Sequence, residues 1–312
     1  MAQHTGATRT PDGANGPERA AGEPPSPTGR LLADPALVVA DGRYYLYPTT
    51  DGHPGWDSTS FSAYSSADLV GWRDEGVVLR LGVDVKWAAR HAWAPAIAER
   101  DGAFYLYFTA EQSIGVARAD APTGPFEDLG RPLVAAGGFP GVAIDPSVFT
   151  DDDGVTYLYW GNGVAHGVPL NDDLMSFDPE RVVSWVPTGF REAATVHRHH
   201  DRYYLSWSEN DTREPDYRVR YAVGPGPLGP WQDRGVLLEK RPERGILGTG
   251  HHAILRAPDG DRWIIAYHRF AIPGGDGFHR EIMFDWLVHR PDGDLEPVTP
   301  ARTHIRVPIP PR

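Results

Sequence analysis

The chain has 312 residues, of which 40% are hydrophobic and 23% charged, a composition typical of a globular protein. Its formal net charge of −12 argues against a nucleic-acid partner, and the absence of cysteine excludes disulfides, zinc–thiolate sites and a cysteine nucleophile. No apolar run approaches the ~20 residues of a transmembrane helix, so no membrane partner is expected.

The first 29 residues are rich in Pro, Gly, Ala and charged side chains, and they lack a basic start followed by an apolar stretch. This composition predicts a disordered leader over 1–29 and a single domain over 30–312. Without a secretory signal we expect a cytoplasmic protein, or a secreted one if a native signal has been removed.

Five copies of one phrase organise the rest of the chain: a turn with Asp or Gly, then a strand rich in aromatic residues. A short apolar segment precedes each copy, and two strands joined by a tight turn form a β-hairpin. The copies are DGRYYLY (Asp41–Tyr47), DGAFYLYF (Asp101–Phe108), DDGVTYLYW (Asp152–Trp160), HHDRYYLSWS (His199–Ser208) and DGDRWIIAYH (Asp259–His268).

Further runs with strand-like patterns follow the hairpins, as in SAYSSADLVGWRDEGVVL and YRVRYAVGPGPLGPWQDRGVLL. They give roughly four strands per unit and five units of about 50–60 residues, a repeat of the kind that forms radial architectures. No segment keeps a 3.6-residue apolar period. The sequence therefore predicts an all-β fold, a five-bladed β-propeller with four-stranded antiparallel blades around a central channel.

Three carboxylates fall at one place in this repeat. Asp34, Asp145 and Glu192 each lie ten or eleven residues before the second strand of a hairpin, at the start of the first strand. Because the first strand of every blade lines the channel, we expect the three to meet at the axis. Clustered carboxylates raise one another's pKa, which provides the protonated and ionised pair that glycoside hydrolysis needs. The alternative is that each Asp-Pro is only a turn that opens a strand.

Several phrases together carry a family resemblance. They are ADPALVVADGRYYLY, HAWAPAIAERDGAFYLYFTAEQSIGVA, IDPSVFTDDDGVTYLYWGN, FREAATVHRHHDRYYLSWSEND, GILGTGHHAIL and YHRFAIPGGDGFHREI. In their order and spacing the chain resembles glycoside hydrolase family 43, the arabinofuranosidase and xylosidase family with a five-bladed propeller, from about Leu31 to Val298.

The resemblance implies a role for each acid in an inverting mechanism. Asp34 corresponds to the general base that activates water, and Glu192 to the general acid that protonates the leaving oxygen. Asp145 corresponds to a residue that tunes the pKa of the acid and orients it. One departure is Glu-Ala-Ala at the acid, where the family often has Glu-Gly-Pro or Glu-Ala-Pro.

The resemblance also implies three residues around the acids. Trp93 and Arg280 correspond to substrate-binding positions, and His251 to a histidine that helps hold a central metal, often calcium through waters. No cofactor is required for the expected reaction, and a structural calcium is possible. Two other sequences are interpreted as hairpins: Asp151–Gly154 as a turn at a hairpin tip rather than a calcium loop, and His197–His200 as a solvent-facing hairpin rather than a metal site.

The phrases TAEQSIGVA, WSENDTR and YHRFAIPGGDGFHRE most resemble exo-acting furanosidases. The resemblance therefore implies removal of terminal furanosyl residues from an oligosaccharide or polysaccharide, as an α-L-arabinofuranosidase or β-D-galactofuranosidase. A β-D-xylosidase or endo-arabinanase of the same family is the alternative. More remote are a non-catalytic carbohydrate-binding propeller, which needs no acids in phase, a retaining fructan-cleaving propeller, whose Trp-Met-Asn-Asp-Pro-Asn motif is absent here, and a phosphate-dependent phosphorylase.

Overall fold

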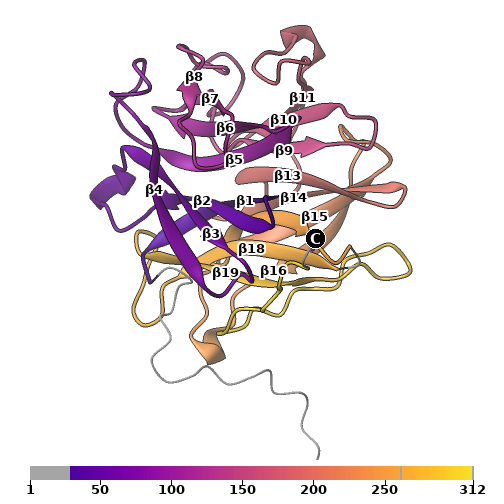
Figure 1. The fold of residues 1–312 in the computed structure, drawn as a ribbon. Helices are drawn as coiled ribbons and strands as arrows, with labels where there is room; N and C mark the ends of the chain where they lie inside the picture. Colours follow the sequence, from indigo (N-terminus) through magenta and orange to yellow (C-terminus); the bar gives the residue numbers. More distant parts are fainter. Residues whose placement is uncertain (1–28, 261, 311–312) are drawn as a thin grey trace, which may run out of the picture.

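The computed structural model describes residues 29–260 and 262–310, so the predicted leader lies almost entirely outside the described residues. These residues form β-strands and three short 3-10 helices, and the strands build five antiparallel sheets arranged around one axis (Figure 1). The predicted all-β, five-bladed propeller is confirmed. In the part of the chain described, no helix is long and apolar enough to span a membrane.

The blades follow one another in chain order, and the first strand of each lies nearest the axis. The strands are β1 (Leu32–Ala40), β2 (Arg43–Thr50), β3 (Ser60–Ser66) and β4 (Trp72–Arg80) in blade 1; β5 (Trp93–Arg100), β6 (Ala103–Ala110), β7 (Ser113–Ala119) and β8 (Glu127–Asp128) in blade 2; β9 (Ser147–Thr150), β10 (Thr156–Trp160), β11 (Ala165–Pro169) and β12 (Val183–Trp185) in blade 3; β13 (Glu192–His199), β14 (Arg202–Glu209), β15 (Arg218–Gly224) and β16 (Gln232–Leu238) in blade 4; and β17 (Gly250–Arg256), β18 (Trp263–Phe270) and β19 (Arg280–Leu287) in blade 5.

Blade 5 differs from the four-stranded pattern, because its sheet has three strands within the described residues. After β19 the chain leaves this sheet. Val298 pairs in parallel with Leu238 at the end of β16, and the N–H of Val307 donates to the carbonyl of Asp68 in blade 1. The C-terminal segment thus contacts blades 4 and 1, and it meets the backbone of β19 in blade 5 through a single hydrogen bond, from the N–H of Ile305 to the carbonyl of Phe284 (3.4 Å), without forming a regular fourth strand there within the described residues.

The hydrophobic core is divided into five clusters, one between each pair of neighbouring blades. Successive side chains of a strand point to opposite faces, so the paired tyrosines of the repeat serve two clusters. Tyr44 packs towards blade 5 and Tyr45 towards blade 2. Tyr203 and Tyr204 divide in the same way between blades 3 and 5. The repeated aromatic phrase therefore holds the blades together in a closed ring.

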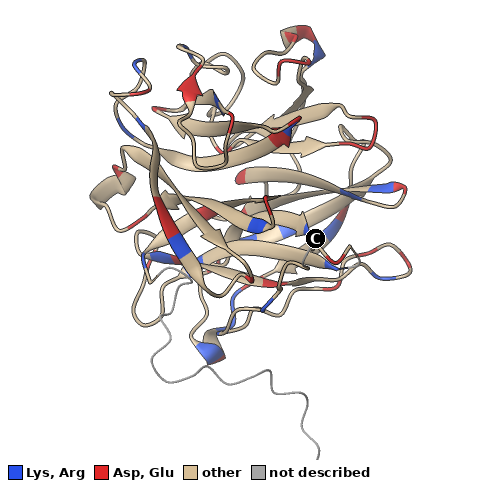
Figure 2. Ribbon diagram, viewed as in Figure 1, with Lys and Arg blue, Asp and Glu red and all other residues tan. Residues whose placement is uncertain are grey.

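Tight turns close the hairpins where the sequence has Asp-Gly. Both residues of the turn are left-handed at Asp41 (φ 49°) and Gly42 (φ 70°), and again at Asp101 (φ 53°) and Gly102 (φ 80°). This is the turn whose twist matches that of the two strands it joins. Charged residues lie mainly in such loops and on the outer strand β4 (Figure 2). The innermost strands, which line the channel, therefore carry few of the charged residues.

Candidate active site

Each blade presents one residue with a left-handed backbone where its innermost strand begins. In β1, β5, β13 and β17 a β-bulge accompanies it, seen as a shift in the pairing register. Positive φ is uncommon outside glycine, and bulges re-aim side chains. The five residues are Asp34 (φ 50°), Ala94 (φ 41°), Asp145 (φ 57°), Ala193 (φ 57°) and His251 (φ 43°).

A hydrogen bond from the preceding blade holds each of these residues. In three blades the backbone N–H of the residue donates to a side chain of the neighbouring second strand: Ala94 to Thr49 (2.7 Å), Asp145 to Thr109 (3.0 Å) and His251 to Ser208 (3.0 Å). In blade 1, Nδ1 of His268 donates to Oδ1 of Asp34 at 3.0 Å and lies 3.4 Å from its backbone N. Blade 3 has Gly161 at this step, and the N–H of Ala193 donates instead to the Asp145 carboxylate. Asp145 therefore completes the ring of contacts and fixes the backbone directly after Glu192.

The expectation that all three acids occupy the same step of the repeat is wrong for Glu192 by one residue. Ser208 pairs with Glu192 as Thr49 pairs with Ala33, the residue before Asp34. The bulge position of blade 4 thus belongs to Ala193. β1 and β13 have the same one-residue bulge, so the difference was already in the count: Asp34 lies ten residues before Tyr44, whereas Glu192 lies eleven before Tyr203.

Asp34 is buried among positive and polar groups. Its Oδ1 lies 3.0 Å from Nδ1 of His268, 3.3 Å from Nη1 of Arg280 and 3.4 Å from Nδ1 of His251. Burial alone would raise the pKa of Asp34, but Arg280 and the histidines outweigh it and hold the pKa well below its usual value. Arg280 is the permanent charge, since burial lowers the pKa of both histidines, that of His268 to about 4. Asp34 is therefore an ionised carboxylate.

Glu192 and Asp145 lie in the opposite electrostatic setting. Burial raises the pKa of Glu192, although Tyr217 donates to Oε1 at 2.9 Å and Asn162 to Oε2 at 2.8 Å. Burial raises the pKa of Asp145 well above its usual value, and the charges of Glu192 and Asp34 raise it further. Two such neighbours do not ionise together easily, so this pair retains a proton where Asp34 does not.

Arg280 is a buried side chain fixed from two directions. Its Nε donates to Oδ2 of Asp51 at 2.9 Å and its Nη2 to Oδ1 at 3.2 Å, while Nη1 reaches Asp34 and, at 3.3 Å, Thr212. The two hydrogen bonds to Asp51 form a fork that sets the plane of the guanidinium. Arg280 therefore faces the pocket in one orientation, next to Asp34.

Two tryptophans form an aromatic wall beside these charges. Trp93 donates from Nε1 to the carbonyl of Trp56 at 2.6 Å, and Trp56 donates from Nε1 to the carbonyl of Gly277 at 2.9 Å. The Trp56 ring stacks on Phe278, with centroids 4.4 Å apart. The wall thus joins the loop after β2 to the loop before β19.

The three acids face one cavity of about 230 Å³. It is lined by Asp34, Trp56, Trp93, Ile144, Asp145, Asn162, Arg191, Glu192, Asp211, Thr212, Arg213, His251 and Arg280. All six residues singled out from the sequence are in this list, so the fold brings them together. Their individual roles stay predictions.

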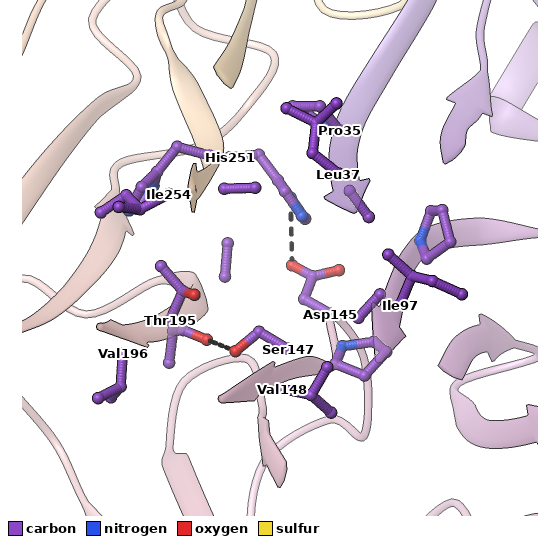
Figure 3. A pocket seen from close by; sticks show the side chains of 18 residues that line it. Pro35, Leu37, Ile97, Asp145, Ser147, Val148, Thr195, Val196, His251 and Ile254 are labelled. Atoms are coloured by element: carbon purple, nitrogen blue, oxygen red, sulfur yellow. Dashed lines mark hydrogen bonds and ion pairs between the residues drawn. The ribbon is translucent and has the colours of Figure 1, made fainter. Parts of the chain in front are cut away.

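A second, narrower cavity of about 80 Å³ continues along the axis between the innermost strands. Figure 3 shows Asp145 and His251 pointing toward each other in its lining, with Nδ1 of His251 3.7 Å from Oδ2 of Asp145. Calcium takes six to eight oxygen ligands. The described residues contain no group of three or more His, Asp or Glu arranged to hold a metal ion. The residues do not fit a directly held calcium, and a hydrated ion at His251 stays a prediction.

Several residues in or next to the pocket were not found from the sequence. Tyr217 and Asn162 hold Glu192, and neither stands at a repeated position of the aromatic phrase. Arg191 and Arg213 lie beside the acid in loops without a repeat. Only closeness in sequence to the acid could have pointed to any of them, as for Arg191, which directly precedes Glu192.

The whole segment His197–His200 was expected to face solvent, but only part of it does. His200 is exposed, whereas His197 is 3% exposed and its Nε2 lies 2.9 Å from Nε2 of His289. The alternation of a strand explains the difference, because His197 lies on the face of β13 that packs against blade 5.

The chain is similar to several proteins named as glycosidases. A β-D-galactofuranosidase of Aspergillus niger is 30% identical over 85% of this chain and 82% of its own. A xylosidase/arabinosidase of Bacteroides ovatus is 29% identical over 86% of this chain and 94% of its own. A β-xylosidase/α-arabinofuranosidase from a compost metagenome, solved with xylotriose in a calcium-free form, has a TM-score of 0.73 and 30% identity over 87% of this chain and 95% of that one.

The family described as glycosyl hydrolases family 43 matches residues 26–295, which span all five blades. The match therefore covers both the ring of blades and every residue that lines the pocket. The chain belongs to glycosyl hydrolases family 43 and is a glycoside hydrolase.

Proposed function

We propose that the protein is an inverting exo-glycosidase that removes one terminal sugar, with a furanoside as the preferred substrate. One observation carries the proposal: Asp34, with its pKa held low, shares a small pocket with Glu192, whose pKa is raised. One ionised and one protonated carboxyl group at the same pH are what single-displacement hydrolysis needs.

Asp34 acts as the general base in this mechanism. Its ionised carboxylate accepts a proton from water, and the resulting nucleophile attacks the anomeric carbon. An inverting enzyme places its two carboxyl groups about 6.5–9.5 Å apart, which leaves room for that water. Arg280 and His268 fix the carboxylate through contacts at 3.3 Å and 3.0 Å. The base is therefore oriented before substrate arrives.

Glu192 acts as the general acid and gives its proton to the leaving oxygen. The carboxylate that remains accepts hydrogen bonds from Tyr217 and Asn162, which stabilise the charge as it develops. Asp145 acts as the positioning residue, since it binds the N–H of Ala193 directly after the acid. This arrangement assigns each carboxyl group a different task.

Pocket size and neighbouring groups support a single sugar ring. The cavity of about 230 Å³ is smaller than the ~300–1,000 Å³ of clefts for drug-sized ligands. The Trp56 ring provides a face for the sugar, and Arg280 provides donors for its hydroxyl groups. Among the relatives, the galactofuranosidase favours a furanoside, and the name of the xylosidase/arabinosidase covers both sugars. A β-D-xyloside is the second candidate, favoured by the relative solved with xylotriose.

Two measurements test the proposal. Initial rates on nitrophenyl α-L-arabinofuranoside, β-D-galactofuranoside and β-D-xylopyranoside rank the sugars, with a furanoside expected first. NMR of the released sugar in the first minutes reports its anomer, and inversion is expected. Retention of configuration, or turnover that requires phosphate, would overturn the mechanism. A higher rate on the xyloside would overturn only the choice of sugar.

A further inference from the structure

Two arginines at the pocket share a single carboxylate. Arg213 donates from Nε to Oδ1 of Asp211 at 2.8 Å, and Arg191 places Nη2 3.5 Å from Oδ2 of the same residue. The side chains of Arg191 and Arg213 are 45% and 55% exposed, and both line the cavity. These arginines and Asp211 are called the arginine rim below.

The arginine rim carries more positive than negative charge. Two guanidinium groups stand against Asp211, whose pKa the hydrogen bonds from Arg213 lower to about 2, so that it is ionised. Glu192 adds no charge while it holds its proton. Glu214 is exposed and attracts Arg213 only through space. While Glu192 is protonated, one positive charge of the rim is therefore left without an ionised partner in contact with it among the described residues.

The deep end of the pocket has the opposite balance. There Asp34 and Asp51 stand against the single guanidinium of Arg280. The cavity thus has a negative inner end, which suits a neutral sugar, and a positive rim. An anionic group on a bound substrate is repelled from the first and attracted to the second.

The arginine rim lies on the side of the pocket where the leaving group must sit. Arg191 precedes the acid in the chain, and its Nε lies 3.9 Å from Oε2 of Glu192. Because the acid delivers its proton to the leaving oxygen, the part of the substrate beyond that oxygen passes next to Glu192. The rim therefore faces the leaving group rather than the sugar that is removed.

From this geometry we infer that the leaving-group subsite recognises a carboxylate, as on a sugar chain that bears a uronate. The inference rests on the proposed function, since it takes Glu192 as the acid. A guanidinium pairs well with a planar carboxylate. Arg213 already binds Asp211 through Nε and Nη2, and Arg191 contacts it through Nη2, so the donors left for a substrate carboxylate are the remaining N–H groups of the two arginines. The natural substrate is then a glycosyl group attached to an acidic saccharide.

The test compares two aryl glycosides of the same sugar, one with a 3-carboxyphenyl and one with a 3-carbamoylphenyl leaving group. We expect the wild-type ratio of kcat/KM, carboxylate over amide, to fall about tenfold in Arg213→Gln, which does not contact Glu192. The wild-type ratio should also fall between 20 mM and 500 mM salt, because added ions screen the attraction.

Arg118→Gln is the matched control. Arg118 is 45% exposed, against 55% for Arg213, and likewise pairs with an aspartate two residues away, Asp120, but it lies on β7 of blade 2 outside the pocket. It removes the same charge and should leave the ratio unchanged. An equal ratio in the wild type, Arg213→Gln and Arg118→Gln would overturn the inference while both glycosides are still hydrolysed. Hydrolysis of neither glycoside would instead count against the proposed function.

Discussion

Asp34 and Asp145 are alike in sequence context, in backbone and in burial, yet their pKa values move in opposite directions. Each is followed by proline, has a left-handed φ of 50° or 57°, and is 6% exposed. Arg280 contacts Asp34, and the pKa of that carboxyl group is lowered. Asp145 has Glu192 and Asp34 as charged neighbours, and its pKa is raised.

The difference teaches that burial does not decide which carboxyl group is ionised. Desolvation pushes the pKa of both upward, and the nearest charge then decides the direction. Blade 5 supplies the arginine to one side of the axis, whereas blade 4 supplies a second acid to the other. The ring of blades therefore gives equivalent residues different chemistry.

Loss of the ionised carboxylate should have the largest effect. In Asp34→Asn no base remains to activate water, and we expect kcat/KM to fall about a thousandfold or more. Initial rates on an aryl glycoside measure this. Asp151→Asn is the control, because Asp151 is 8% exposed but contacts Arg198 and Tyr203 outside the pocket. A variant at Asp34 with near wild-type rates would show that this carboxylate is not the base.

Loss of the protonated group should depend on the substrate. In Glu192→Gln we expect a fall of about a hundredfold to a thousandfold on phenyl glycosides, whose leaving oxygen needs a proton. With dinitrophenyl leaving groups the fall should be about tenfold or less. The measurement is the slope of log kcat/KM against leaving-group pKa, which steepens in the variant. An unchanged slope would remove Glu192 from the role of acid.

Arg280→Gln removes the positive charge that lowers the pKa of Asp34 relative to that of Asp145. Burial then dominates at Asp34, so its pKa should rise and the acidic limb of the kcat/KM profile should move to higher pH. We also expect a loss of about a hundredfold at neutral pH. Arg269→Gln is the control, since Arg269 is equally buried and pairs with Glu281 at 2.8 Å. It should lower Tm without moving the acidic limb, and a similar shift in both variants would contradict our explanation.

Asp145→Asn should give the smallest effect, and it should stabilise the fold, whereas the preceding substitutions lower activity or Tm. Because the folded state raises the pKa of Asp145, ionisation favours the unfolded chain once the pH exceeds the usual pKa of 3.8. The neutral variant should therefore unfold at a Tm about 2–4 °C higher at pH 7, with the gain shrinking towards pH 4. Calorimetry at both pH values measures this, and a lower Tm at pH 7 would show that the carboxylate stabilises the fold.

Much of the fold was predictable from local patterns. The Asp-Gly turns and paired tyrosines specified hairpins, and their repetition specified a radial fold, because each blade buries its faces only against its neighbours. The three-stranded sheet that the described residues form in blade 5 was not predictable, since the C-terminal segment contacts blades 4 and 1 through pairings far apart in the sequence.

The sequence by itself determined that Asp34, Asp145 and Glu192 stand at the inner end of three blades, because the repeat places each at the start of a first strand. Only the tertiary structure decided which carboxyl groups are ionised and how Glu192 is held. Arg280 is 246 residues from Asp34, and Tyr217 and Asn162 reach Glu192 from separate strands and loops. Electrostatic interactions depend on distance in space, and closure of the ring of blades sets those distances.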